Sequence, residues 1–211
     1  MSRQVLLAAT AVVIGATLLT SCTGKSPTNG TASPATITTD STSNADLPNS
    51  GAPKVDKPLP AAALAGSPCD SALTAEQLTG YLGQTKAPKA SDTELGPTCD
   101  WASASGSSAG ILVGYDTKSG QGLSLPYKNV KPKAKRWVDD LEPIQGYPAI
   151  GYVDEGTTDN RACVVVVGIA DDLAYSVSLS IGDSAVQAGK DACQLGRGVA
   201  DTVLTNVKAR A

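Results

Sequence analysis

An uncharged run of fifteen residues near the start of the chain, Val5 to Leu19, decides in which compartment the rest of the chain must fold. Arg3 places a positive charge ahead of this run, and a polar tract follows it. Such a run is short for a helix that crosses a bilayer, but it fits the apolar region of a secretory signal. We therefore predict that residues 1–21 are a signal peptide and that the remainder folds outside the cytosol.

The apolar run ends in the sequence Leu19-Thr20-Ser21-Cys22. This junction resembles the lipobox of bacterial lipoproteins, in which a peptidase cuts ahead of a cysteine that carries lipid. The resemblance implies that Cys22 is lipidated, with palmitate-type acyl chains. Because two or three chains hold a protein stably in a bilayer, we expect a lipid-anchored protein on the extracellular face of the cell membrane. The alternative is a plain signal peptide followed by an incidental cysteine.

The residues after Cys22 are predicted to form a disordered linker over 22–65. They are rich in Ser, Thr, Pro, Asn and Gly and contain few large apolar side chains, as in the stretch Ser26-Pro27-Thr28-Asn29-Gly30. Such a composition cannot bury enough apolar surface to offset the entropy of ordering. As a flexible coil, the linker would hold the domain roughly 35 Å from the membrane on average. Its composition also suits O-glycosylation.

Residues 66–211 are predicted to form one globular domain with an aliphatic core. The chain contains no Phe and only two Trp, so Val, Leu, Ile and Ala must fill that core, which favours sheet. Thr74 and Gln77 have the spacing of a capping box, and Leu73 and Leu78 that of a hydrophobic staple, so a helix is predicted to begin at Thr74 and to stop at Gly83.

Short strand patterns occupy most of the domain after this helix. The predicted strands cover 99–102, 110–115, 146–153, 162–169 and 173–181. The strand over 162–169 is apolar on both faces and is expected to be central, whereas 173–181 alternates apolar residues with serines, so one of its faces should be wet. Ala192, Leu195, Val199, Val203 and Val207 form an apolar stripe on a final helix. The expected fold is therefore α+β: an antiparallel sheet packed by an N-terminal and a C-terminal helix.

Four cysteines remain in the domain once Cys22 is set aside: Cys69, Cys99, Cys163 and Cys193. In an exported domain an even number implies two disulfides. A zinc site and redox catalysis are both disfavoured, because the chain has no CxxC pair and no histidine. Chain entropy does not separate the three possible pairings. We favour the pairing of Cys69 with Cys193 and of Cys99 with Cys163.

An ordered set of short motifs spans the predicted domain: Pro68-Cys69-Asp70, Cys99-Asp100-Trp101, Gly146-Tyr147-Pro148-Ala149, Cys163 at the start of a Val-rich strand, and Asp191-Ala192-Cys193. Together with the lipobox, this set resembles a family of actinobacterial envelope lipoproteins known as domain of unknown function 3558. The resemblance implies an extracytoplasmic lipoprotein of a Gram-positive-type envelope. It implies no activity, no cofactor and no catalytic residue.

Candidate binding residues are few. A basic run could contact anionic lipid head groups or phosphate-bearing wall polymers, although a solvated loop is the simpler interpretation; it contains Lys128, Lys131, Lys133, Lys135 and Arg136. The adjacent pairs Asp139-Asp140 and Asp171-Asp172 are interpreted as turn residues, since catalytic carboxylates usually come from different elements. Asp154, Glu155 and Asp159 lack the ligand spacing of an EF-hand, so no metal is expected. Trp101 is interpreted as a core residue, and Trp137 as a second aromatic anchor.

Three functions fit these features. The leading expectation is a non-enzymatic binding or interaction module of the envelope, which docks an envelope protein or holds a small apolar or wall-derived ligand. The second is an accessory subunit of a secretion or transport complex, and the third a carboxylate-dependent wall hydrolase. Without histidine the chain lacks the commonest general base, and its net charge of −3 argues against nucleic acid as a partner. No cofactor is expected.

Overall fold

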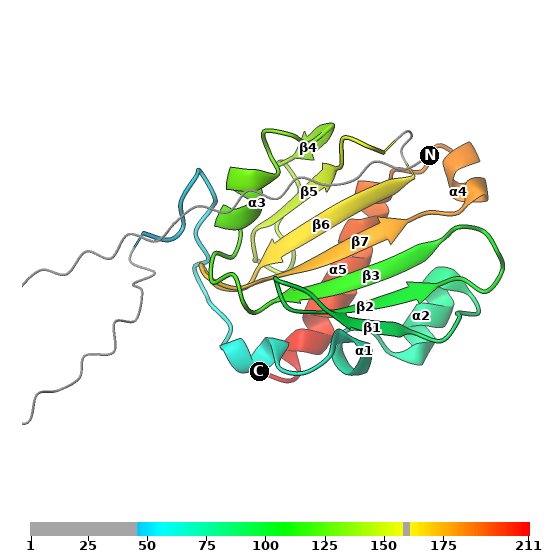
Figure 1. Ribbon diagram of the computed structural model, residues 1–211, viewed down its shortest axis with the longest axis horizontal. Helices are drawn as coiled ribbons and strands as arrows, with labels where there is room; N and C mark the ends of the chain where they lie inside the picture. The colour runs from blue at the N-terminus through cyan, green and yellow to red at the C-terminus, as the bar shows by residue number, and fades with distance from the viewer. Residues whose placement is uncertain (1–45, 158–160) are drawn as a thin grey trace, which may run out of the picture. The chain divides into compact units, whose positions relative to one another are not determined.

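The computed structural model describes residues 46–157 and 161–211. Within these residues the strands form one antiparallel sheet in the order β1-β2-β3-β7-β6-β5-β4 (Figure 1). The strands are β1 Lys89–Asp92, β2 Pro97–Ala102, β3 Gly110–Asp116, β4 Arg136–Val138, β5 Ala149–Val153, β6 Ala162–Gly168 and β7 Ala174–Ser180. The α+β fold predicted from the sequence is confirmed, while β1 and β4 had no strand signal of their own.

Strands β6 and β7 form a hairpin that joins the two halves of the sheet. Val165 lies opposite Val177, and β7 pairs on its other side with β3. The Val-rich β6 lies inside the sheet between β7 and β5, as expected of a strand that is apolar on both faces, and β7 takes the middle position of the seven. The alternation along β7 is confirmed, because Tyr175, Val177 and Leu179 are buried while the serines between them are half-buried.

The helices of the described residues are η1 Ala61–Leu64, α1 Pro68–Ser71, α2 Ala75–Leu82, α3 Ser124–Asn129, α4 Asp183–Gln187 and α5 Ala192–Lys208. Helix α2 begins at the predicted capping box: Gln77 N–H donates to the Thr74 hydroxyl, and the Gln77 side chain accepts from Thr74 N–H at 2.8 Å. It ends at Gly83, whose φ is 69°. Glycine adopts this positive φ with little strain, because it has no Cβ. Helix α3 was not predicted.

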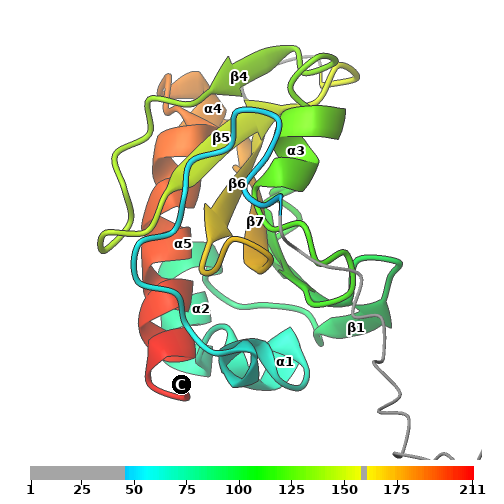
Figure 2. The ribbon, with the colours of Figure 1, turned by 90° about the vertical axis from the view of Figure 1, so that its left-hand side faces the viewer.

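Helix α5 covers one face of the sheet, and α3 lies on the opposite face (Figure 2). Ala192, Val199, Val203 and Val207 are buried as the stripe predicted. Leu195 differs, because 43% of it is exposed, and its place against the sheet is taken by Gly196. A Cβ at Gly196 would lie 3.2 Å from a methyl group of Val165, so the missing side chain lets the helix approach the strands closely.

The main core lies between the sheet and α5. Tyr115 and Tyr175 are its largest fully buried side chains, and Trp101, 2% exposed, is confirmed as a core residue. The Tyr175 hydroxyl donates to the Ala200 carbonyl of α5 at 2.7 Å. Burial raises the pKa of Tyr175 well above its ordinary value, so the phenol is neutral and keeps this donor at any physiological pH.

Two disulfides join neighbours in sequence order: Cys69 with Cys99, and Cys163 with Cys193. The presence of two disulfides is confirmed, but the pairing favoured from the sequence is wrong. Each bridge ties the start of a helix to a strand that this helix region packs on, α1 to β2 and α5 to β6. Sequence spacing is 30 residues in both bridges, so loop length alone does not reveal this arrangement.

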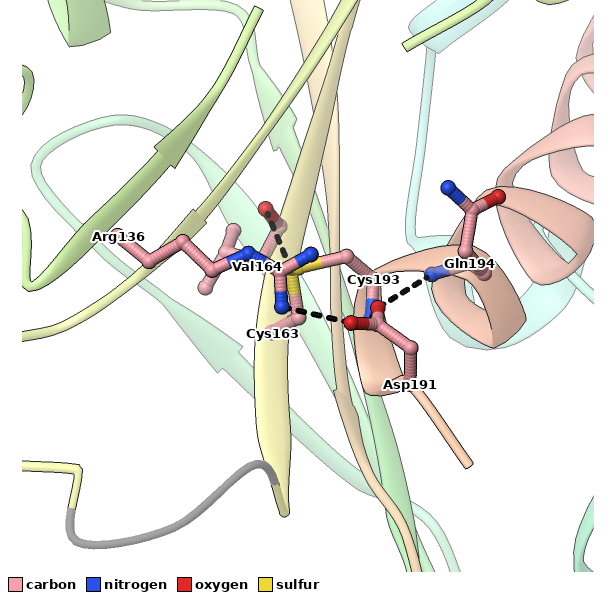
Figure 3. Close-up of a disulfide and its surroundings, with 6 residues drawn as sticks. All are labelled: Arg136, Cys163, Val164, Asp191, Cys193 and Gln194. Carbon is pink, nitrogen blue, oxygen red and sulfur yellow. Dashed lines mark hydrogen bonds and ion pairs between the residues drawn. A yellow bond between two sulfur atoms is a disulfide. The ribbon is translucent and has the colours of Figure 1, made fainter. Parts of the chain in front are cut away.

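The start of α5 is fixed beside the second bridge (Figure 3). Asp191 is the N-cap and accepts hydrogen bonds from the backbone amides of Cys193 and Gln194. Its other oxygen lies 2.6 Å from a guanidinium nitrogen of Arg136 on β4. Partial burial by itself raises the pKa of the Asp191 carboxyl, but these hydrogen bonds and the charge of Arg136 outweigh it, so the pKa is lowered.

Residues 46–65 belong to the folded domain, which corrects the predicted boundary at residue 66. We call these residues the N-terminal strap; in Figure 2 it runs from beside α3 to the end of α5. Val55 and Leu64 are 5% and 1% exposed, and the Leu59 amide donates to the Ile169 carbonyl at 2.8 Å. The few apolar side chains of this polar stretch suffice because each meets a site already formed by the sheet and α5. Residues 22–45 of the predicted linker lie outside the described residues.

The part of the chain that the structure describes holds no helix long and apolar enough to cross a membrane.

Candidate functional site

The face of the sheet opposite α5 is only partly covered. Leu123, the N-cap of α3, packs on Ile150 and Val166, so that this segment covers β5 and β6. Over β2, β3 and β7 the same face remains accessible: Leu112 is 37% exposed, and Asp100 and Ser178, which flank it across the strands, are half-buried. On this half of the sheet no helix of the described residues packs over Leu112.

A hollow of about 480 Å³ lies on this uncovered half. Its floor comes from β2, β3 and β7, and its rim from the 103–109 turn and from Lys86, which precedes β1. We call it the serine hollow. It is lined by Lys86, Asp100, Ala102, Ser103, Gly106, Ser108, Ala109, Gly110, Leu112, Ser178 and Ser180. Alternation along β7 places Ser178 and Ser180 on this face.

The polar side chains of the serine hollow have unused hydrogen-bonding capacity. Within the described residues, no side-chain partner is found for Lys86, Asp100, Ser108, Ser178 or Ser180. One ammonium, one carboxylate and three hydroxyls therefore face a shared space with donors and acceptors free. A concave surface with few convergent polar groups is the usual form of a ligand site.

The rim of the hollow is held in place by a buried hydroxyl. Ser103, 5% exposed, donates to the Leu82 carbonyl at the end of α2 at 3.0 Å, and its Oγ lies 2.9 Å from that of Ser105. On the far side of the turn, Ser107 approaches Gly182, where an added Cβ would lie 3.3 Å from the Ser107 side chain. The turn is closed by the hydrogen bond from the Ser103 amide to the Ala109 carbonyl at 2.9 Å, and the Ser103 hydroxyl ties it to α2.

Apolar hollows are smaller. One of about 180 Å³ lies between α2, α4 and α5 and is bordered by Tyr81 and Leu195, which are 42% and 43% exposed. Another of about 110 Å³ lies beside α3, over Val166 and Ala174. The small apolar ligand that was one sequence-based expectation has less space here than a polar ligand has in the serine hollow.

The basic run does not present five free cations. Lys131 pairs with Asp139 at 3.1 Å, Arg136 pairs with Asp191, and the Lys135 ammonium donates to the Thr157 carbonyl. Lys128 and Lys133 have no partner among the described residues, but Lys133 shares a hollow with Asp154 and Glu155. The residues proposed for an anionic surface are thus interleaved with acidic groups, which reduces their combined field.

The remaining candidate residues either make contacts that hold the fold together, are exposed, or lie outside the described residues. Asp171 accepts from the Val55 amide at 2.8 Å and so fastens the N-terminal strap to the β6–β7 turn. Asp154 and Glu155 are exposed, while Asp159 lies outside the described residues. In residues 46–157 and 161–211 no group of three or more His, Cys, Asp or Glu side chains has the geometry of a metal site. Cys22 also falls outside the described residues.

The sequence alone predicts some residues of the serine hollow but not how they come together. The serines of β7 were recognised as a wet face, but their meeting with Asp100 follows from the pairing of β3 with both β2 and β7. Lys86 had no distinguishing pattern. Its position depends on the backbone bond from Lys86 N–H to the Ala102 carbonyl, which holds the segment after α2 against the end of β2.

Comparison with protein families gives one result. A family model described as a protein of unknown function, DUF3558, matches residues 17–206. The chain belongs to this family. The matched residues include the predicted lipobox, the N-terminal strap and nearly the whole domain. This agrees with the resemblance to the same family that the ordered motifs indicated. No curated protein and no solved structure matches the chain.

Proposed function

We propose that this DUF3558 protein is a lipid-anchored, extracytoplasmic binding module that holds a polar, wall-derived ligand in the serine hollow and catalyses no reaction on it. The observation that carries the proposal is the convergence of Lys86, Asp100 and unpaired hydroxyls on one hollow of about 480 Å³.

The anchored location rests on the sequence around Cys22 and is consistent with two features of the domain. Both disulfides are of the kind that persists in oxidising compartments outside the cytosol. Between Cys22 and Asp46, where the described residues begin, lie 23 residues of Ser/Thr-rich sequence.

A binding role is favoured over hydrolysis by the chemistry of the hollow. Asp100 is its one carboxylate, whereas glycoside hydrolysis uses a pair across the scissile bond. The chain also has no histidine to activate a serine. Among the described residues, Asp139 and Asp191 are the carboxyls with a clearly shifted pKa, and both pKa values are lowered, which is opposite to the shift of a general acid.

The ligand class follows from the lining. Hydroxyl and amide groups of a glycan or a short peptide match the serine hydroxyls, while one cationic and one anionic group match Asp100 and Lys86. Wall glycopeptides carry all of these groups. An apolar ligand would leave the same lining groups without partners, at a cost for each one that is desolvated.

Soluble wall glycopeptides are expected to bind the full-length chain in non-ionic detergent and to raise its melting temperature. Ligand at 100 times its Kd stabilises the folded state by about 2.7 kcal/mol. Lys86→Ala and Asp100→Ala should each weaken binding about tenfold or more, since a hydrogen bond to a charged group contributes about 1.5–3 kcal/mol. Differential scanning calorimetry measures the rise in melting temperature, and isothermal titration calorimetry measures the loss of affinity in the variants.

The control for this experiment is a pair of leucine substitutions. Ser180→Leu fills the hollow and should abolish binding, whereas Ser91→Leu, on the exposed strand β1 away from the hollow, should leave it unchanged. Equal affinity of the Ser180→Leu and wild-type proteins would refute the assignment of the hollow.

The anchor has a separate test. In cells, Cys22→Ser is expected to abolish incorporation of labelled palmitate and to remove the mature protein from the membrane fraction, because no acyl chains remain to hold it. A Cys22→Ser protein that still fractionates with membranes and carries label would contradict lipidation at this residue.

An accessory subunit of an envelope complex is the second candidate. Tyr81 and Leu195 favour it, because two large apolar side chains more than 40% exposed flank one apolar hollow on α2 and α5. Exposed apolar surface of this kind is typical of protein contacts.

A further inference from the structure

Three of the chain's eight Tyr and Trp residues gather at the β4 edge of the sheet. The Tyr127 and Trp137 rings meet edge to face, with centroids 5.1 Å apart and an angle of 80° between their planes. Tyr152, opposite Trp137 in the β4–β5 pairing, stacks on its indole at 13° and 6.4 Å. The two nearly perpendicular rings form a corner, and the third supports it.

A cation occupies this corner. The Lys131 ammonium lies 4.9 Å from the centroid of Tyr127 and 5.4 Å from that of Trp137, over both rings. The Asp139 carboxylate closes the site at 3.1 Å from the same nitrogen. Two aromatic faces and one carboxylate around one nitrogen are the components of an aromatic cage for ammonium ligands.

We propose that Tyr127, Trp137 and Asp139 form an aromatic cage for an external alkylammonium group, and that Lys131 is its built-in competitor. The site goes beyond the function proposed above and is separate from the serine hollow. Three strand spacings lie between β4 and β7, roughly 14 Å. The ligand class is an amine or quaternary ammonium group carried by an envelope molecule. The cage would recognise the cationic group and not the rest of the molecule that carries it.

The rings are held in place independently of Lys131. Trp137 and Tyr152 belong to paired strands, and Tyr127 belongs to α3, which is packed on the sheet through Leu123. Burial raises the pKa of Tyr127 and, to about 12, that of Tyr152, so both rings are neutral at physiological pH. The cage therefore keeps its shape and charge when its cation leaves.

Lys131 can leave because its side chain is bound by little else. It is exposed, in a turn after α3, and its backbone amide is fixed by the Pro126 carbonyl. The side-chain contacts in the described structure are those with Tyr127, Trp137 and Asp139. A tethered group of this kind competes at an effective concentration in the millimolar range, which a multivalent or concentrated ligand exceeds.

The test uses tetramethylammonium chloride and the two indole N–H signals of the ¹⁵N-labelled full-length chain in non-ionic detergent. Trp137 reports the cage, and the buried Trp101 serves as an internal reference for folding. In Lys131→Ala the Trp137 signal is expected to shift saturably, with a Kd in the millimolar range that is about tenfold lower than for wild type. The Trp101 signal should not move.

Three controls separate the cage from general charge effects. Lys133→Ala removes the same charge from a lysine outside the cage and should bind as wild type does. Tyr127→Leu in the Lys131→Ala background keeps apolar volume but removes one ring, and should lose most of the response. Sodium chloride at equal ionic strength should give no saturable shift. A linear response in Lys131→Ala, or one that Tyr127→Leu leaves unchanged, overturns the proposal.

Discussion

Replacing Cys163 and Cys193 together by alanine is expected to lower the free energy of unfolding by roughly 3–4 kcal/mol. The bridge closes a loop with a separation of 30 residues, and opening it increases the entropy of the unfolded chain. It also holds the first turn of α5 on β6, where both sulfurs are buried beside Gly151. Urea unfolding of the non-reduced proteins measures the difference.

The matched comparison is Cys69→Ala with Cys99→Ala. Because this bridge spans the same 30 residues, chain entropy predicts the same loss for both double variants. Cys69 is only half-buried, however, and α1 is one turn long, so the loss of packing should be smaller than at α5. A Cys163/Cys193 variant that is less destabilised than the Cys69/Cys99 variant would show that the bridge at α5 is not the more important one.

Leu64→Ala is expected to destabilise the domain by about 3 kcal/mol, within the range for a buried leucine in a core. Leu64 is 1% exposed and belongs to the same cluster as Val203 and Leu204 of α5. In a disordered linker the same substitution would change the stability by almost nothing. The measurement therefore distinguishes a strap that is part of the core from a spacer that only follows the anchor.

Lys57→Ala is the control for the strap, because Lys57 is exposed and pairs with no described residue. Its free energy of unfolding should stay within about 0.5 kcal/mol of the wild-type value. If Leu64→Ala proved as mild as Lys57→Ala, the strap would not contribute to the core and the boundary near residue 66 would be restored.

The boundary error has a physical origin in composition. Residues 46–65 are mostly polar, Pro and Ala, so a local measure of hydrophobicity assigns them to the linker. Their order depends on Val55, Ala63 and Leu64, which reach the core through contacts more than a hundred residues away in sequence. A short polar segment can be ordered by two or three such contacts when the surface that it meets is already folded.

The aromatic cage and the serine hollow show the same dependence on strand order. Tyr127, Trp137 and Asp139 lie within one stretch of sequence, but the corner between the rings requires α3 to pack over β5 and β6. The residues of the hollow come from β2, β3 and β7, which are brought together by a crossover that no local pattern encodes. The two proposed sites are thus products of the sheet topology.

Local patterns in the chain were sufficient to predict the helices α2 and α5, most strands, the wet face of β7 and the existence of two disulfides. Each of these depends on neighbours a few residues apart, through capping bonds, side-chain alternation or an even cysteine count. The disulfide pairing, the central position of β7, the burial of the strap and both candidate sites required the tertiary structure. They arise from contacts between segments that are distant in sequence. The two disulfide loops have equal lengths, so loop entropy does not distinguish the pairings, and only the order of the strands in the sheet determines which segments meet.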